Sequence, residues 1–187
     1  MTAVLLSPRA LLGLLDQWVA RDWLRELDVA LVRFLHEESP ETSAAVLLSA
    51  ALVSHQLGRG HVCLDLRRTL EQPGDTLAIP PERYTPPDLP VLEQPDEMIR
   101  GWTLPSWCAE LQRSDLVDDG SGQSPLVLSG HRLYLRRYWC HERDTEHAIE
   151  RRLALSESMA SGATHAARYA ALSAATARVE EQNRLLE

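Results

Sequence analysis

The sequence predicts an α+β fold that is mostly helical and carries a small three-stranded antiparallel sheet. Apolar residues recur at helical spacing in three N-terminal segments, alternate at strand spacing over residues 62–66, and alternate again on both sides of the dipeptide Gly130-His131. The chain has 187 residues, which suits one domain with an appendage better than two domains.

Three helices are expected in the N-terminal part. The first follows Pro8 and carries the apolar residues Leu11, Leu12, Leu15, Trp18 and Val19. The second ends near Glu38 and carries the apolar residues Leu24, Leu27, Leu31, Phe34 and Leu35. The third covers residues 41–57, with Ser39 as N-cap, Pro40 in the first turn and Gly58 as C-terminal cap. It is apolar nearly all round, which is typical of the buried centre of a domain.

The middle of the chain combines a strand, a loop and a helix. Val62, Leu64 and Leu66 alternate with polar residues and predict a short, half-buried strand. Residues 72–105 hold most of the chain's 11 prolines and predict a long surface loop, with one turn of helix near residues 97–100. A short helix over residues 105–114 is expected to place Trp107 and Leu111 on one side.

A β-hairpin is expected around Gly130-His131, because glycine suits the first position of a two-residue type II′ loop. This loop predicts the pairs Leu128–Leu133, Val127–Tyr134 and Leu126–Leu135. The leucine face is expected to join the strand at residues 62–66 over the third helix, with Trp139 closing the core. The opposite face carries Val127, Arg132, Tyr134 and Arg136.

The rest of the chain is expected to be helical. A helix over residues 142–159 turns Ile149 and Leu153 inward, Ser161-Gly162 ends it, and an Ala-rich helix starts at His165. We therefore divide the chain into a domain of residues 1–155 and an Ala-rich helical tail of residues 156–187. The central order of helix, helix, strand, helix and hairpin is that of a winged-helix-like core.

Composition excludes several function classes. All 19 residues of the Lys-plus-Arg count are arginine, so no P-loop lysine, Schiff-base lysine or Ser-Lys dyad is present. The odd number of cysteines, three, argues against a disulfide scaffold. The sequence has neither a signal peptide nor an apolar run of the ~18 residues that a membrane span needs. These features predict a cytoplasmic protein without a membrane segment.

No catalytic or cofactor-binding constellation is found. A zinc site from His61, Cys63, Cys108 and Cys140 is one hypothesis, but no C-x-x-C or H-x-x-x-H spacing supports it, and small buried cysteines are the favoured interpretation. DNA binding is a second hypothesis, because Arg132 and Arg136 flank Tyr134 on one hairpin face and Arg137 follows. The net charge of -8 favours a solvated face balanced by nearby acidic residues.

Two segments resemble a known family. They are S-H-Q-L-G-R-G-H-V-C-L-D-L at residues 54–66 and P-L-V-L-S-G-H-R-L-Y-L-R-R-Y-W-C-H-E-R at residues 125–143, with a weaker match at residues 24–31. Together they resemble the N-terminal domain of RecD, the alpha subunit of exodeoxyribonuclease V (the RecBCD helicase–nuclease). The positions that carry this signature are His55, Gly58, Gly60, His61, Cys63, Leu64, Leu133, Tyr134, Leu135 and Trp139.

The resemblance implies a non-catalytic assembly domain. It would dock on RecC-like and RecB-like subunits, with DNA reached through the complex and with Arg132, Arg136 and Arg137 as contact candidates. The family's ATP- and Mg²⁺-binding motor follows this domain, and its P-loop does not occur in this sequence. We therefore expect either an N-terminal fragment of a RecD-type subunit or a stand-alone descendant without the motor. The alternative is a stand-alone winged-helix-like DNA-binding or regulatory module.

Overall fold

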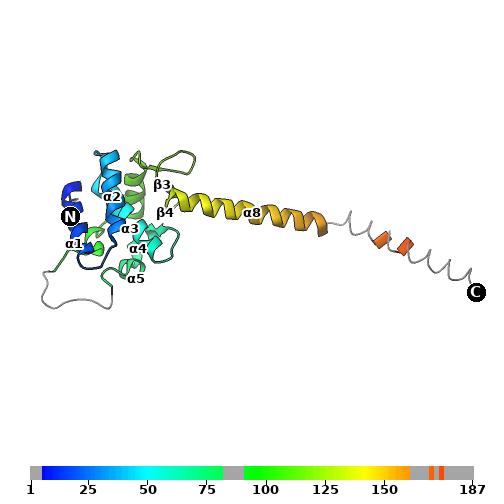
Figure 1. The fold of residues 1–187 in the computed structure, drawn as a ribbon, viewed down its shortest axis with the longest axis horizontal. Helices are drawn as coiled ribbons and strands as arrows, with labels where there is room; N and C mark the ends of the chain where they lie inside the picture. The colour runs from blue at the N-terminus through cyan, green and yellow to red at the C-terminus, as the bar shows by residue number, and fades with distance from the viewer. Residues whose placement is uncertain (1–5, 82–90, 161–168, 171–172, 175–187) are drawn as a thin grey trace, which may run out of the picture. The chain divides into compact units, whose positions relative to one another are not determined.

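The computed structural model describes residues 6–81, 91–160, 169–170 and 173–174 (Figure 1). The chain divides into two compact units, Met1–Cys140 and His141–Glu187. The helices are α1 Pro8–Val19, α2 Glu26–Glu38, α3 Ala44–Gly58, α4 Leu66–Glu71, α5 Pro73–Leu77, α6 Pro95–Met98, α7 Leu104–Gln112 and α8 Arg136–Ala160. The strands are β1 Leu64–Asp65, β2 Val117–Asp118, β3 Leu126–Ser129 and β4 Arg132–Leu135. The prediction of a mostly helical fold with a small sheet is confirmed.

Helix α3 is the centre of the first unit, as its sequence predicts. It contacts α1, α2, α5, α7, β1 and β4, and Figure 1 shows it among these elements. Residues on every side of it are buried, among them Val46, Leu47, Ala50, Leu52 and Val53. Its predicted start is wrong, because Ser43 is the N-cap. Ser39 is instead the C-cap of α2, because its N–H donates a hydrogen bond to the carbonyl of Leu35.

Of the apolar residues that the sequence places at helical spacing in the second helical segment, only some are buried. The helix buries Val29, Val32 and Leu35, whereas Leu27 and Phe34 are 65% and 56% exposed. The cause is Asp28, which is fully buried and bonded to the hydroxyl of Ser54 on α3. This polar contact fixes the rotation of α2 about its axis, and it overrides the apolar periodicity.

The sheet confirms the hairpin and corrects its surroundings. Strands β3 and β4 pair in the predicted register, Leu128 with Leu133, and Gly130 has φ +61°. Strand β1 pairs antiparallel with β4, as predicted. A fourth strand, β2, pairs parallel with β3, so the sheet is mixed, with the order β1-β4-β3-β2. Strand β2 has only two residues, so its sequence shows no alternation of apolar and polar residues that could predict a strand. The winged-helix-like arrangement is not confirmed.

The predicted strand at residues 62–66 is shorter in the structure. Only Leu64 and Asp65 pair, and Leu66 begins α4. The carboxylate of Asp65 accepts a hydrogen bond of 3.0 Å from the N–H of Arg68, which makes Asp65 the N-cap of that helix. Val62 is consequently 46% exposed rather than half-buried in a strand face.

The proline-rich segment contributes to the core, contrary to the prediction of a surface loop throughout. Pro73 and Pro95 begin α5 and α6, where a missing N–H and a fixed φ suit the first helical turn. Leu77, Ile79 and Ile99 are buried against the main cluster. The expected helical turn near residues 97–100 is found as α6, and residues 82–90 of the predicted loop lie outside the described residues.

The later helices follow the prediction in part. Helix α7 buries Trp107 and Leu111, as expected. Helix α8 begins directly after β4, and in it Ile149 and Leu153 are 51% and 58% exposed, so their predicted inward position is wrong. The break at Ser161-Gly162 lies outside the described residues, as does the Ala-rich tail apart from residues 156–160, 169–170 and 173–174. Across the described residues, no helix is long and apolar enough to cross a membrane.

Candidate interaction site

The sheet brings the two signature segments into direct contact. Leu64 pairs with Leu133 in the β1–β4 ladder, and both side chains are fully buried. The next residue but one, Leu66, donates its N–H to the carbonyl of His131 at 2.9 Å. Segments that are far apart in the sequence therefore form one structural unit, and the leucines of the signature belong to its core.

Asp65 gathers two basic side chains at the end of the hairpin. Its Oδ2 lies 3.5 Å from Nε2 of His131 and 3.9 Å from Nε of Arg132. A hydrogen bond with Tyr134 raises the pKa of Arg132. Tyr134 itself is buried, as is Val127 beside it. The predicted hairpin face is thus largely covered rather than an open cationic surface.

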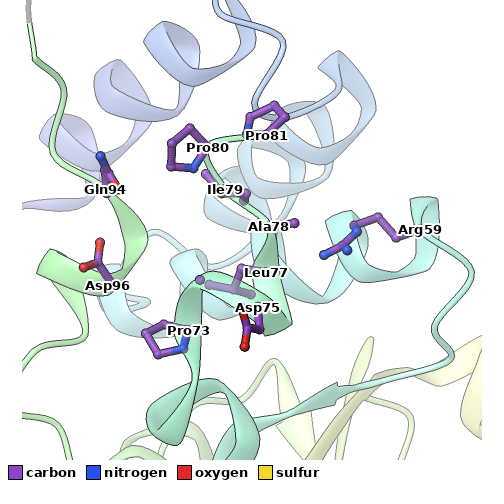
Figure 2. Close-up of a pocket in the computed structure, with 11 residues that line it drawn as sticks. Arg59, Pro73, Asp75, Leu77, Ala78, Ile79, Pro80, Pro81, Gln94 and Asp96 are labelled. Carbon is purple, nitrogen blue, oxygen red and sulfur yellow. The ribbon is translucent and has the colours of Figure 1, made fainter. Parts of the chain in front are cut away.

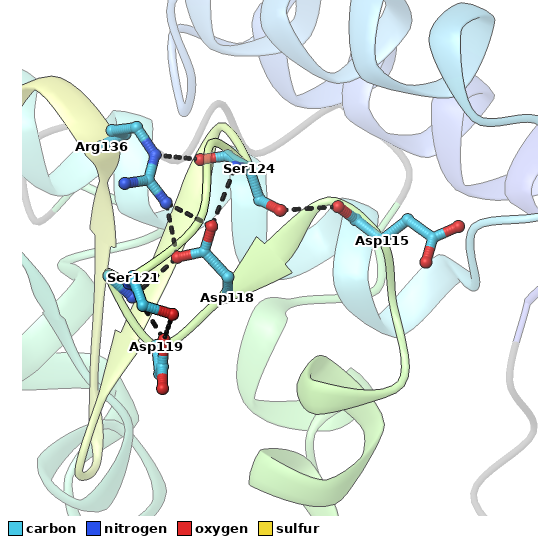
Figure 3. Close-up of polar contacts among 7 residues, drawn as sticks. Asp115, Asp118, Asp119, Ser121, Ser124 and Arg136 are labelled. Atoms are coloured by element: carbon cyan, nitrogen blue, oxygen red, sulfur yellow. Dashed lines mark hydrogen bonds and ion pairs between the residues drawn. The ribbon is translucent and has the colours of Figure 1, made fainter.

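Arg136 is bonded inside the domain, as Figure 3 shows. Its guanidinium donates to both carboxylate oxygens of Asp118 and, through Nε, to the carbonyl of Ser124. The Arg136 and Asp118 side chains are only 19% and 17% exposed. Asp118 also accepts the N–H groups of Gly120, at 2.7 Å, and Ser124, at 2.9 Å. Arg136 therefore closes the loop between β2 and β3, whereas Arg137 is exposed.

These contacts change the ionisation of Asp118. Burial opposes its charged form, but the hydrogen bonds from Gly120 and Ser124 and the charge of Arg136 outweigh burial and lower the pKa of Asp118. A carboxyl whose pKa is lowered by folding adds stability above its unfolded pKa of about 3.9, and this stability is lost as the pH falls through the folded value.

We expect Asp118→Asn to lower the free energy of unfolding by about 1–3 kcal/mol at pH 7, because a charge-assisted cluster is lost. The difference from wild type should shrink as the pH falls below the unfolded pKa of about 3.9 and through the lowered folded pKa of Asp118, because the wild-type carboxyl then loses its charge. Urea unfolding at several pH values measures it. Asp115→Asn, at an exposed position just before β2, is the control. A difference that does not change with pH would contradict this assignment.

Trp139 lies over the turn at Gly120 rather than closing the core as predicted. Gly120 has φ +100°, and a Cβ at this position would come within 2.5 Å of Cζ2 of Trp139. The ring is half-buried. The turn therefore needs glycine for two reasons, its backbone conformation and the close approach of the indole.

Gly120→Ala should lower the free energy of unfolding by about 2–4 kcal/mol, the sum of backbone strain and overpacking. Gly101→Ala separates the two contributions, because Gly101 has φ +86° but a Cβ added to it would meet nothing within 4 Å. That variant should lose only about 1–2 kcal/mol. Thermal unfolding of both variants gives the comparison, and equal losses would show that the Trp139 contact adds nothing.

The signature residues at the end of α3 support neighbouring elements. Nε2 of His55 lies 2.9 Å from the carbonyl of Leu77, which ties α3 to α5, and burial lowers the pKa of His55. Gly58 is not the predicted cap, since Arg59 is the C-cap; a Cβ on Gly58 would collide with the guanidinium of Arg25. Gly60 follows with φ +89°. These positions serve the packing of the first unit.

The zinc hypothesis gains no support from the geometry. Cys63 and Cys108 are half-buried and Cys140 is exposed. Within the described part of the chain, no three His, Cys, Asp or Glu side chains are grouped as metal ligands. Burial raises the pKa of the Cys108 thiol, as expected for a cysteine that packs as a small apolar residue.

A cavity of about 750 Å³ lies beside α5 (Figure 2). Its polar lining comes from three elements and comprises Arg59 after α3, Asp75 of α5, and Gln94 and Asp96 at α6. Arg59 donates to the carbonyl of Thr76 at 3.0 Å and so helps to hold α5. The remaining lining is mostly proline, alanine and other apolar residues. Pro81, one of the lining residues, is the last residue before a segment that lies outside the described range. We assign no ligand to this cavity.

Sequence reasoning missed two polar clusters. In the sequence, Asp118 looks like a solvated charge in a turn. An aspartate two residues before a glycine is, however, a signal for a side chain that accepts hydrogen bonds from the N–H groups of the turn. Asp28 lies between apolar residues of α2, and a polar residue inside an apolar stripe is a signal for a buried network. Neither signal alone identifies the residue that the aspartate binds, so neither predicts the cluster from the sequence.

Comparison with known families agrees with the two signature segments. The family model for the N-terminal domain of the RecBCD enzyme subunit RecD matches residues 20–134. This range spans α2 to β4 and includes the first signature segment whole and the second as far as Tyr134. A search of the curated proteins gave no match. Because the family model covers more than half of the chain, including its central helix and its sheet, this protein belongs to the family of RecD N-terminal domains.

Proposed function

We propose that the chain acts as a non-catalytic assembly domain of a RecD-type subunit. It docks on RecC-like and RecB-like subunits of a DNA helicase–nuclease complex that processes DNA ends and repairs double-strand breaks. Since such partners act on the chromosome, the proposed location is the cytoplasm. ATP and Mg²⁺ are assigned to the family's motor and not to this chain.

One observation carries this proposal: three polar side chains of the signature segments, those of His55, Asp65 and Arg136, serve internal contacts. Arg136 is bonded to Asp118, His55 to the carbonyl of Leu77, and Asp65 to the N–H of Arg68. Groups that are used in this way stabilise the domain and are not poised to act on a substrate. We therefore propose that the domain provides a binding surface within a complex and does not itself catalyse a reaction.

The DNA-binding alternative has less support. A phosphate-binding face needs several free cations close together. Of the three candidate arginines, Arg136 is engaged by Asp118, Arg132 lies beside Asp65 and Tyr134, and Arg137 is exposed. The net charge of -8 adds a general repulsion of DNA.

The two functions separate in one pair of experiments. The affinity-tagged chain is co-expressed with RecC, with RecB, or with both, and the eluate is analysed for stoichiometric complexes. We expect RecC-containing complexes that survive gel filtration. The purified chain is then mixed with labelled duplex DNA at low salt, where we expect no change in fluorescence anisotropy. Duplex binding without any RecC or RecB association would overturn the proposal in favour of the alternative.

A further inference from the structure

Helix α2 is apolar on two opposite sides. One side faces the core with Val29, Val32 and Leu35. On the other side Leu27 is 65% and Phe34 56% exposed and Ala30 is exposed, whereas Leu31, at the edge of this side, is half-buried and packs in part against the core. These four residues follow the spacing i, i+3, i+4, i+7, which is the pattern of a helix that packs against a partner on that side. We refer to Leu27, Ala30, Leu31 and Phe34 as the outer face of α2.

The outer face cannot turn into the core. Asp28 lies on the core side, fully buried, and holds the hydroxyl of Ser54 at 2.6 Å and the guanidinium of Arg25 at 2.6 Å. Rotation of α2 that buried Phe34 would expose this network and break its bonds. This network therefore opposes burial of the outer face by rotation of α2, and contiguous exposed apolar residues mark interaction sites.

Acidic side chains border the outer face. Helical geometry places Glu37 and Glu38 on the same side of α2 as Phe34, and Glu26 one turn before Ala30; all three glutamates are exposed. Arg33, a cation on the same helix, is paired with Asp16 of α1. The face therefore combines an apolar centre with a negative border.

We infer that the outer face of α2 is the docking site for an amphipathic helix of the RecC-like subunit, with apolar side chains flanked by arginine or lysine. This inference rests on the proposed function and identifies the surface that performs it. Opposite charges around an apolar centre select the partner and its orientation. A second copy of this chain fits less well, because a symmetric pair of outer faces would bring like-charged glutamates together.

The experiment compares the affinity of a RecC-like subunit for the full chain and for three variants by isothermal titration. Leu27→Asp combined with Phe34→Asp should weaken binding by about tenfold or more, since exposed anchors become charged. Glu37→Arg combined with Glu38→Arg leaves the apolar residues in place, should also weaken binding, and should reduce its dependence on salt. Val62→Asp, at a position that is 46% exposed in the segment between α3 and β1, is the matched control and should bind like wild type.

The outcomes separate the two proposals. If the wild-type chain does not bind, the proposed function fails. If the wild-type chain and the Leu27/Phe34 variant bind equally, the inference about α2 fails while the function stands. Light scattering on the free chain covers the last case: a dimer that the Leu27/Phe34 variant abolishes would make a second copy the occupant and would overturn the inference. Circular dichroism confirms that each variant is folded, and the glutamate variant keeps the test valid should the aspartate variant unfold.

Discussion

Asp28→Ala is expected to lower the free energy of unfolding by about 1–3 kcal/mol, because a fully buried carboxylate that accepts bonds from the half-exposed Arg25 and from the buried Ser54 is removed. Asp28 accepts three hydrogen bonds from Arg25, through its backbone N–H, Nε and a terminal nitrogen, and one from the hydroxyl of Ser54. Arg25 in turn donates to the carbonyl of Ser54 at 2.7 Å. Without the carboxylate, a guanidinium and a hydroxyl lose their acceptor at the α2–α3 contact.

The contrast with a surface pair makes this prediction specific. Asp16 and Arg33 form an ion pair whose side chains are 50% and 51% exposed. Asp16→Ala should therefore change the free energy of unfolding by no more than about 1 kcal/mol. Urea denaturation of both variants at pH 7 provides the measurement. A loss at Asp28 as small as that at Asp16 would mean that the network does not fix α2.

Trp107→Ala should cost about 3–5 kcal/mol, because it removes a large buried side chain and leaves a cavity. The ring is 1% exposed, packs edge-on against Trp102 with ring centroids 5.1 Å apart, and donates its Nε1–H to the hydroxyl of Ser49 at 2.8 Å. This contact joins α7 to the middle of α3. The same Ser49 hydroxyl donates to the carbonyl of Ala45 at 2.7 Å, so it has its acceptor within the helix.

Two further variants divide the contribution of Trp107. Trp107→Phe keeps most of the ring area and loses the hydrogen bond, so about 1–2 kcal/mol should be lost. Trp102→Ala, at the half-buried partner ring, should cost less than Trp107→Ala. Thermal and denaturant unfolding give the values. If Trp102→Ala proved the more damaging change, the position of α7 on α3 would need revision.

Local chemistry explains which parts of the fold the sequence predicts correctly. The hairpin register follows from one glycine and the alternation around it, because a two-residue loop leaves a single pairing. The burial of α3 follows from its lack of a polar side. In both cases the decisive information lies within a few residues of the chain.

Sequence analysis misses features whose structure depends on a polar partner far away in the sequence. The rotation of α2 depends on Ser54, which is 26 residues from Asp28 in the sequence. The role of Arg136 depends on Asp118, 18 residues earlier. Apolar spacing does not distinguish the exposed Leu27 and Phe34 from the buried Leu35, and a series of arginines does not show which of them is engaged within the domain. Once these polar partners are known, the outer face of α2 becomes the better candidate for contact with another protein.

The most direct measurement is sedimentation velocity of the purified chain with an equimolar RecC-like subunit at micromolar concentration. The proposed assembly function predicts that the slow boundary of the free chain disappears into a faster boundary of a one-to-one complex, and that the Leu27/Phe34 variant restores the slow boundary. Two boundaries at the positions of the separate proteins, with the wild-type chain folded, would contradict the assembly function.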